Sequence, residues 1–302
     1  MQLGVIDIGG TSIKYGIATE QGELSHLHSI PTEASKGGPV LVEKVKHICD
    51  QLLKDSKLEG IAISSAGQID NIHGTVVFAT DTIPGYTGTP LAELISQHTG
   101  LPVTVENDVN CTALGEYWQG AAKGVRDFLC VTIGTGIGGA LFLNGKLYTG
   151  TSFSAGEIGH INLYPNGKPC TCGNTGCYEQ YASSSALTQL VEQKFGKAIP
   201  LEQFFEMVKE GHPDALDLYT QWTADVATGI GSLVHIFNPQ LVLIGGGISA
   251  QGEFLLQGIE SSLSKKVMPS FKKPLSIKIA ENENKANLLG AARHFLNMNP
   301  VT

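Results

Sequence analysis

A strand–glycine turn–strand pattern occurs twice in this chain, and it constrains the fold more than any other feature. The first copy is Val5-Ile6-Asp7-Ile8-Gly9-Gly10-Thr11, and the second is Cys130-Val131-Thr132-Ile133-Gly134-Thr135-Gly136. In both copies an apolar, β-forming run ends at glycine and a second strand-like run follows. One supersecondary motif repeated in both halves of a chain predicts two related lobes, each carrying a glycine hairpin, that face each other across a cleft.

Predicted strands and helices alternate around these hairpins, as in an α/β protein. We expect a first lobe of residues 1–118 plus 287–302, and a larger second lobe of residues 119–286 that contains a cysteine loop at 160–177. The predicted strands are 2–7, 12–19, 24–30, 58–65, 102–106, 127–133, 140–143, 240–244 and 275–280. The predicted helices are 38–54, one that starts at Thr89-Pro90, 110–120, 184–195, 200–209, 213–236, 252–267 and 285–297. Within 213–236, residues at helical spacing are expected to pack in the core: Leu216, Tyr219, Trp222, Val226, Ile230 and Val234.

The charge balance argues against nucleic acids and anionic membranes as partners, since both require a positive surface. The formal net charge is −8. Residues 1–19 lack the basic start of a secretory signal, and the apolar stretch 128–143 is interrupted by glycines that make it a poor membrane helix. We therefore expect a cytoplasmic protein. The one local basic group is expected to be a solvated face; it comprises Lys265, Lys266, Lys272 and Lys273.

The second hairpin formally matches the dinucleotide pattern G-x-G-x-x-G between Gly134 and Gly139, with Glu157 near the expected distance for the acidic residue. That pattern requires a helix after the glycines. Here the segment 140–143 is strand-like and ends in an Asn-Gly turn, which cannot offer a pyrophosphate the N-terminus of a helix. The dinucleotide interpretation is therefore rejected.

A glycine hairpin can instead point successive backbone N–H groups at one anion. The hydroxyls of Thr11 and Thr135 and the charge of Lys14 add to two such nests, which suit the β- and γ-phosphates of ATP. Asp7, at the end of its strand, is placed to hold Mg²⁺ through water. A single hairpin is equally well explained as a turn without a ligand. Two hairpins together with the glycine turn 245–247 favour a nucleotide site.

An acidic residue stands where a strand gives way to a helix, in Glu106-Asn107-Asp108-Val109-Asn110. Taken alone, Asp108 is best explained as a helix N-cap. The functional alternative is that Asp108 is a general base that accepts the proton of a sugar hydroxyl during attack on the γ-phosphate, which contributes about 10²–10⁴-fold to rate. Asn107 offers a donor and an acceptor to a pair of sugar hydroxyls.

One histidine and three cysteines form the most specific local signal in the chain: His160, Cys170, Cys172 and Cys177. A Cys₃His set suits tetrahedral Zn²⁺, and with all four positions filled by protein the zinc would be structural. A disulfide does not fit the cytoplasm. Fixing this loop would also aim two neighbouring carboxylates, Glu157 and Glu179, although their position alone favours simple surface exposure.

Taken in order along the chain, these motifs resemble the ROK family (repressors, open reading frames and sugar kinases). The resemblance covers nearly the whole length and rests on segments 7–11, 106–108, 134–139, 156–160 and 170–179. It implies an α/β, two-lobed, actin-like ATPase fold of the hexokinase and Hsp70 type, with a cleft between the lobes. It also implies a cytoplasmic ATP-dependent sugar kinase that uses ATP, Mg²⁺ and structural Zn²⁺ and assembles as a homodimer or homotetramer.

The resemblance further implies roles for individual residues. Asp108 would be the base, and the sugar would be contacted by Asn107, Glu157, His160 and Glu179. His160 would hold zinc through one ring nitrogen and face the sugar with the other. The residues expected to contact the nucleotide and its metal are Asp7, Gly9, Gly10, Thr11, Lys14, Gly134, Thr135, Gly136, Gly138, Gly245, Gly246 and Gly247.

Two alternatives limit what the resemblance implies. Sugar-responsive repressors of the family carry an N-terminal helix-turn-helix, for which the first hairpin at residue 7 leaves no room, so the kinase is favoured over the regulator or sensor. Glucokinases of the family have an Asn-x-Pro-Gly-Trp-like segment, where this chain has Thr82 and Tyr86. N-acetylmannosamine, glucose, fructose and a glucoside all stay open as substrates.

Overall fold

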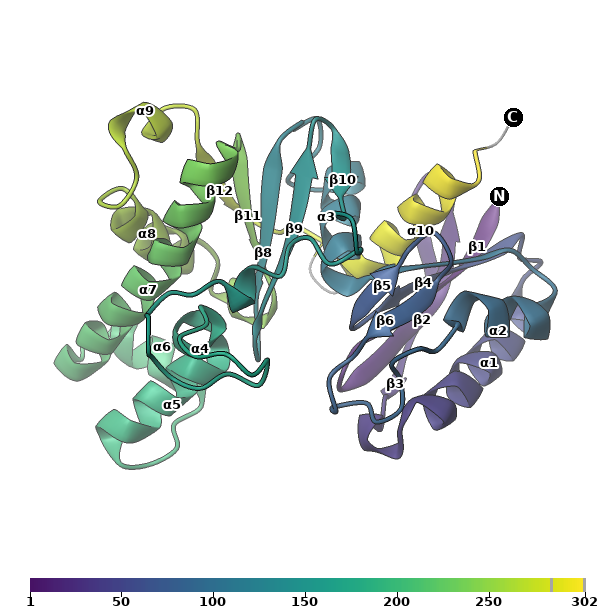
Figure 1. The fold of residues 1–302 in the computed structure, drawn as a ribbon, viewed down its shortest axis with the longest axis horizontal. Helices are drawn as coiled ribbons and strands as arrows, with labels where there is room; N and C mark the ends of the chain where they lie inside the picture. Colours follow the sequence, from purple (N-terminus) through teal and green to yellow (C-terminus); the bar gives the residue numbers. More distant parts are fainter. Residues whose placement is uncertain (283–284, 301–302) are drawn as a thin grey trace. The chain divides into compact units, whose positions relative to one another are not determined.

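The computed structural model describes residues 1–282 and 285–300, which form two compact units, each built on one five-stranded sheet (Figure 1). Unit 1 comprises Met1–Gly124, Leu147–Ala155 and Glu281–Thr302, and unit 2 comprises Val125–Lys146 and Gly156–Ala280. Within the described part of the chain, no helix combines the length and the apolar composition needed to span a bilayer.

The sheet of unit 1 has the strand order β3-β2-β1-β4-β7. Its strands are β1 (Gln2–Ile8), β2 (Ser12–Thr19), β3 (Leu24–Pro31), β4 (Gly60–Ser65) and β7 (Val103–Asn107), with β1 antiparallel to β2 and parallel to β4. A separate hairpin is formed by β5 (Gln68–Asp70) and β6 (Thr75–Phe78). The helices of unit 1 are η1 (Ala34–Lys36), α1 (Gly38–Asp55), α2 (Leu91–Thr99), α3 (Asp108–Gln119) and α10 (Ala286–Met298).

Alternation along β1 sorts its side chains between two cores, because successive residues of a strand point to opposite faces. Ile6 and Ile8 pack with residues of α1 and α2, whereas Leu3 and Val5 pack with residues of α3 and α10. Figure 1 shows α1 and α2 on one side of this sheet and α10 on the other. Asp7 continues the row of Leu3 and Val5, so it points toward α3 and α10.

The sheet of unit 2 repeats this order as β10-β9-β8-β11-β12. An antiparallel hairpin again lies beside two parallel strands, which confirms the predicted repetition. Its strands are β8 (Phe128–Ile133), β9 (Ile137–Leu143), β10 (Lys146–Tyr148), β11 (Leu241–Gly245) and β12 (Ser276–Ile279). The helices are η2 (Ile158–His160), α4 (Glu179–Ala182), α5 (Ser184–Phe195), α6 (Leu201–Lys209), α7 (Pro213–Phe237), η3 (Gly247–Gln251), α8 (Gly252–Leu263) and α9 (Pro269–Lys272).

All predicted strands and helices are present, but some details differ. Several short elements were not predicted from the sequence, among them β5, β6, β10, α4 and α9, each of which is four residues long or shorter. Leu216, expected in the core stripe of α7, is 40% exposed, while the other five residues of that stripe are buried. In the first turns of α7 the core is covered by Ala215 and Leu218 instead.

The division into units differs from the expected one at three segments, because 119–124, 147–155 and 281–286 belong to unit 1. The buried carboxylate of Glu116 explains two of them. It accepts hydrogen bonds from the backbone N–H groups of Ala121 (2.9 Å), Glu281 (3.1 Å) and Asn282 (2.7 Å). In the third, Ser154 donates to Gln68 at 2.9 Å.

Candidate functional site

Asp7 lies at the end of β1 in unit 1 and is only 4% exposed. Its Oδ1 accepts hydrogen bonds from Ser64 Oγ (2.7 Å) and Asn287 Nδ2 (3.0 Å). Burial raises the pKa of Asp7, and the two hydrogen bonds and the charge of Lys14 act in the opposite direction. Neither Ser64 nor Asn287 was identified from the sequence, since each belongs to a different element and has no motif of its own.

Asn107, rather than Asp108, is the N-cap of α3. Its Oδ1 accepts from the backbone N–H groups of Val109 (2.9 Å) and Asn110 (3.1 Å). Its Nδ2 donates to the carbonyl of Gly67 (2.8 Å) and to Asp108 Oδ1 (3.0 Å). The carboxamide therefore makes all four of the hydrogen bonds it can make, and a sugar hydroxyl would have to replace one of them.

Asp108 lies in the first turn of α3, and only part of its carboxylate is hydrogen-bonded. Among the described residues, only Oδ1 accepts hydrogen bonds, from Val109 N (2.9 Å) and from Asn107. Burial and the nearby charge of Asp7 raise the pKa of Asp108 to about 7. A carboxylate that titrates near neutrality is suited to general acid–base work.

Glu106 anchors the strand end that carries these residues, and it is completely buried. It accepts hydrogen bonds from Asn71 Nδ2 (2.6 Å), Asn107 N (2.8 Å) and Asn110 Nδ2 (2.9 Å), and His294 Nδ1 lies 3.8 Å away. Burial lowers the pKa of His294. The carboxylate thus ties β7 and α3 together directly beneath Asp108.

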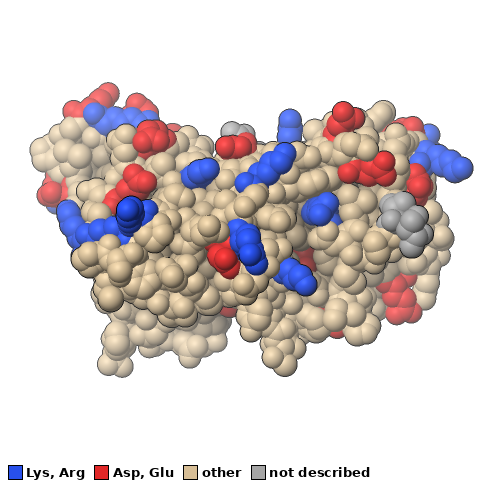
Figure 2. Space-filling model, turned by 90° about the horizontal axis from the view of Figure 1, so that it is seen from above, with Lys and Arg blue, Asp and Glu red and all other residues tan. Residues whose placement is uncertain are grey.

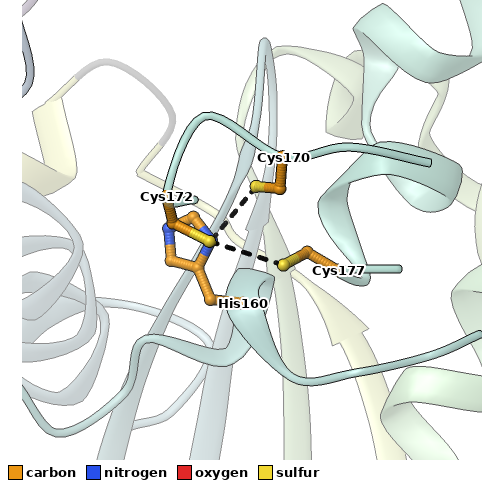
Figure 3. A group of neighbouring side chains, drawn as sticks. All are labelled: His160, Cys170, Cys172 and Cys177. Carbon is orange, nitrogen blue, oxygen red and sulfur yellow. Dashed lines mark hydrogen bonds between the residues drawn. The ribbon is translucent and has the colours of Figure 1, made fainter. Parts of the chain in front are cut away.

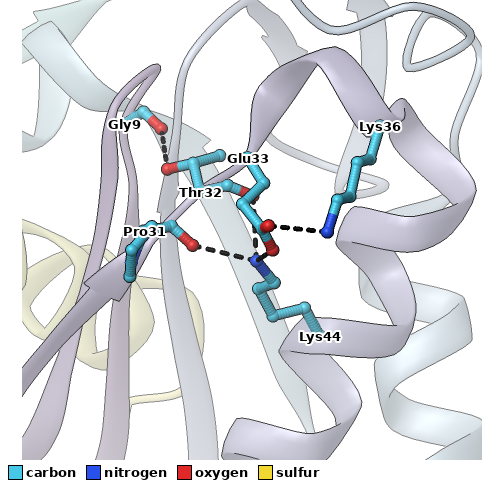
Figure 4. Close-up of polar contacts among 6 residues, drawn as sticks. All are labelled: Gly9, Pro31, Thr32, Glu33, Lys36 and Lys44. Atoms are coloured by element: carbon cyan, nitrogen blue, oxygen red, sulfur yellow. Dashed lines mark hydrogen bonds and ion pairs between the residues drawn. The ribbon is translucent and has the colours of Figure 1, made fainter.

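The first glycine hairpin is held from behind by Thr32 and Lys44 (Figure 4). Thr32 Oγ1 donates to the carbonyl of Gly9 (2.6 Å), and Thr32 N donates to that of Thr11 (2.9 Å). Lys44 Nζ in turn donates to the carbonyl of Thr32 (3.1 Å) and to Glu33 (2.7 Å). The carbonyl oxygens of Gly9 and Thr11 therefore already accept hydrogen bonds from within the protein.

The second glycine hairpin, in unit 2, is brought beside two other predicted site elements. Gly246, with φ at 82°, packs so closely on the end of β8 that a Cβ would lie 2.5 Å from the carbonyl oxygen of Ile133. A Cβ on Gly136 would lie 2.7 Å from Glu179 Oε2. The hairpin, the third glycine turn and Glu179 are thus neighbours within one unit.

The four predicted metal ligands converge as the sequence predicts (Figure 3). The ligand atoms of His160, Cys170, Cys172 and Cys177 all lie within 4.8 Å of one another. Cys170 Sγ lies 3.7 Å from His160 Nδ1, and Cys172 Sγ lies 3.6 Å from Cys177 Sγ, too far for a disulfide bond. These separations and donor types fit tetrahedral Zn²⁺, whose bonds to nitrogen and sulfur are about 2.0–2.3 Å.

The metal loop is supported by a polar network that the sequence did not reveal. Tyr164 donates to Asp225 on α7 at 2.5 Å, and Lys168 N donates to the hydroxyl of Tyr181 at 2.6 Å. Gly176 has a φ of 75° and passes against the carbonyl of Tyr164, so no side chain fits there. The loop is therefore pre-shaped by its packing.

Comparison with known proteins decides the family, since the sequence matches the ROK family over residues 3–297. The chain belongs to the ROK family. A beta-glucoside kinase of Listeria monocytogenes is 33% identical, with 98% of each chain covered. A ROK glucokinase of Streptomyces griseus, solved with glucose and AMPPNP, is 31% identical with a TM-score of 0.85, covering 97% of this chain and 98% of that one.

A second similar structure is that of a protein of Listeria monocytogenes proposed to be an N-acetylmannosamine kinase. It is 30% identical with a TM-score of 0.88, and 98% of this chain and 99% of that chain are covered. The two α/β units are accordingly the lobes of the actin-like fold shared by these ROK proteins.

In the segment around residues 80–86, the two departures from the glucokinase pattern lie in different environments, and Tyr86 is part of the core. This side chain is fully buried, and its hydroxyl lies 2.9 Å from Ser65 Oγ, so it belongs to the core of unit 1. Thr82 is exposed and accepts a hydrogen bond from Thr80 at 3.0 Å. Of the two departures noted in this segment, only Thr82 is on the surface.

Within each unit, several of the site residues predicted from the sequence lie close together. Unit 1 holds Asp7 and Asp108 together, beside the first hairpin. Unit 2 holds the second hairpin, Glu179 and the cysteine cluster together, and the Glu157–His160 segment packs on β9 through close glycine contacts at Gly139 and Gly159. On the face shown in Figure 2, basic side chains stand mostly singly among uncharged and acidic ones.

Proposed function

We propose that this chain is an ATP-dependent sugar kinase that phosphorylates a hydroxyl of a hexose or N-acetylhexosamine. The observation that carries the proposal is the carboxylate of Asp108, whose pKa is raised to about 7 at a strand end where Asp7 is its electrostatic neighbour. In such a pair the carboxylate of Asp108 can accept a proton near neutral pH, and the carboxylate of Asp7 can interact with a cation.

In the proposed reaction Asp108 accepts the proton of the sugar hydroxyl. The hydroxyl oxygen forms a bond to the γ-phosphorus of ATP while the bond from that phosphorus to the ADP oxygen breaks. Asp7 would hold Mg²⁺ through water, and the bound ion would supply neutralisation of phosphate charge. Asn107 aligns Asp108 through the hydrogen bond at 3.0 Å.

The glycine turns support a nucleotide as the phosphoryl donor. Gly10, Gly134 and Gly247 each have open space where a Cβ would lie, and none has a positive φ. No described residue requires glycine at these three positions, and one of them lies in each of the three turns. A ligand that approaches the backbone closely, such as a phosphate on N–H groups, would require glycine there. Thr11, Thr135 and Lys14 would add donors and charge.

We propose that the residues that contact the sugar are Asn107, Asp108, Glu157, His160 and Glu179. His160 Nδ1 is directed at the cysteine cluster, which leaves Nε2 for the sugar. A structural Zn²⁺ on His160 and the three cysteines would fix the ring and aim Glu179, whose Oε1 lies 3.2 Å from Cys170 Sγ.

The sugar itself is the part of the proposal that needs a screen. Three ROK relatives of nearly equal identity, 30–33%, are named for glucose, a beta-glucoside and N-acetylmannosamine. Whole-chain similarity therefore does not select among them. The exposed Thr82 offers one short hydroxyl where the asparagine of the glucokinases offers a donor and an acceptor on separate atoms, which favours a sugar other than glucose.

The direct test is an ADP-release assay with ATP and Mg²⁺ over a panel of hexoses, N-acetylhexosamines and glucosides. We expect turnover with at least one sugar, reduced about 10²-fold or more by Asp108→Asn with sugar affinity retained. Tight sugar binding without turnover would contradict the proposed kinase activity and indicate a sugar sensor. Light scattering during size-exclusion chromatography tests the proposed dimer or tetramer, and a monomer would refute it.

A further inference from the structure

We infer that Asn287, assisted by Thr112, is a positioning residue that keeps Asp7 ionised and aligned with Asp108; the inference rests on the proposed kinase. Asn287 Nδ2 donates to Asp7 Oδ1 at 3.0 Å. The Thr112 hydroxyl lies 2.5 Å from Asn287 Oδ1 and 3.1 Å from the carbonyl oxygen of Asp108. One chain of polar contacts therefore runs from Asp7 through α10 to the backbone of Asp108.

Asn287 reaches Asp7 because α10 and α3 cross in direct backbone contact. A Cβ added to Gly115 or to Gly290 would lie well under 3.0 Å from the carbonyl oxygens of Ala286 and Cys111, respectively. Glycine at both positions removes the side chains that would separate the helices. The start of α10, with Asn287, is thereby placed against Thr112 and the end of β1.

The orientation of the carboxamide follows from its second partner. The Thr112 hydroxyl has one proton, and it lies closer to Asn287 Oδ1 (2.5 Å) than to the carbonyl oxygen of Asp108 (3.1 Å), so it donates to Oδ1 and leaves the Nδ2 end facing Asp7. Asp7 then receives an N–H donor, which favours the ionised form of a buried carboxylate. An aspartate at 287 would place an acceptor, or a second charge, against it.

The environment of Asp7 makes this donor consequential. Two elements bring titratable groups near Asp7: β2 carries Lys14, and α3 carries Asp108 and Cys111. Besides Asn287, the other hydrogen-bond partner of Asp7 is Ser64 on β4. The charge of Asp7 raises the pKa of Asp108, so the ionisation of Asp7 also bears on the proposed base. Hydrogen bonds to charged groups are strong enough that losing one changes an equilibrium about tenfold or more.

Four variants and a matched control test the inference. Asn287→Ala and Asn287→Asp remove or reverse the donor, and Thr112→Val and Thr112→Ser remove or keep the hydroxyl. The control is Asn297→Ala, which makes the same change on an exposed position of α10. Kinase activity is measured against Mg²⁺ concentration and pH, and the thermal midpoint of metal-free protein is measured against pH.

For Asn287→Ala we expect a Mg²⁺ requirement raised about tenfold, an acid limb of the pH–rate profile moved to higher pH, and an unchanged KM for the sugar. The Mg²⁺ requirement should rise further in Asn287→Asp, rise less in Thr112→Val, and stay close to that of the parent protein in Thr112→Ser. The metal-free midpoint of Asn287→Ala should fall relative to Asn297→Ala as pH rises, because an ionised Asp7 loses its donor.

Two results overturn the inference. One is an Asn287→Ala protein with the Mg²⁺ requirement and pH profile of Asn297→Ala. The other is a drop in thermal midpoint that is the same at every pH, which a purely structural contact would give. If the parent protein phosphorylates no sugar, the proposed function fails, while the metal-free titration still decides whether Asn287 supports the charge of Asp7.

Discussion

Replacing Asp108 by asparagine should stabilise this protein while it removes the activity. The pKa of Asp108 is raised from 3.8 to about 7 by burial and by Asp7. A carboxyl group whose folded pKa lies above its unfolded value binds its proton more tightly in the folded state. Its contribution to stability is therefore present at low pH and is lost as the pH rises through about 7. Asparagine cannot ionise and escapes this loss.

The magnitude follows from the shift of about three pKa units. At about 1.36 kcal/mol per unit, ionisation of Asp108 costs the folded state at most about 4 kcal/mol at pH 8 and almost nothing at pH 4. For domains of 150–250 residues, about 2–4 °C of thermal midpoint corresponds to 1 kcal/mol. We expect Asp108→Asn to raise the midpoint of the unit 1 transition by as much as about 8–16 °C at pH 8.

Differential scanning calorimetry between pH 4 and 8, without metal or nucleotide, measures this difference. Glu23→Gln is the matched control, because it neutralises an exposed carboxylate in the same unit. An Asp108→Asn midpoint that does not exceed that of the parent at pH 8, or a gain that is equal at pH 4, would refute the reasoning. So would an equal gain in Glu23→Gln.

Three further predictions concern the glycines and the metal. Gly10→Ala should leave the thermal midpoint unchanged and raise the KM for ATP severalfold, because its Cβ meets nothing in the chain; an unchanged KM would remove the first hairpin from the nucleotide site. Gly290→Ala should lower the thermal midpoint. Alanine gains about 1 kcal/mol in helix propensity, but overpacking against the Cys111 carbonyl costs about 1–3 kcal/mol or more. A higher midpoint would contradict the close crossing of α3 and α10. Cys172→Ser should lower the zinc content from about one per chain, measured by mass spectrometry of the metal, and weaken sugar binding; retained affinity without metal would separate the loop from the sugar site.

What the sequence predicted well was encoded locally. The hairpins, the Cys₃His cluster and the strand-to-helix junction at Asp108 each lie in one short segment, where turn residues and ligand spacing carry the information. The repeated hairpin predicted two related lobes, and the two units have matching strand orders. The cluster in particular required only that a glycine-rich loop bring His160 next to three nearby cysteines.

What the sequence did not predict depends on contacts between distant elements. Asn287 and Asp7 are 280 residues apart in the chain, and Ser64 and Asp7 are 57 apart. No periodicity or spacing marks such partners. The N-cap explanation weighed for Asp108, beside its role as the base, is wrong as well, since the sequence does not separate two neighbours that are almost equally good N-caps. Only the fold shows that Asn107 takes the cap, so that the carboxylate of Asp108 is not needed for it.

The glycines separate the requirements of the fold from those of a ligand. Gly290 and Gly246 are needed because another part of the chain occupies the space of a Cβ, so a methyl group there must disturb the fold. Gly10, Gly134 and Gly247 have no such neighbour and no left-handed backbone, so a methyl group there should disturb only what approaches from outside. Alanine at these two sets of positions should therefore give opposite results, stability lost in the first and nucleotide affinity lost in the second. If Gly10→Ala and Gly134→Ala instead lost stability and kept their affinity for ATP, the turns would be structural and the nucleotide would have to bind elsewhere.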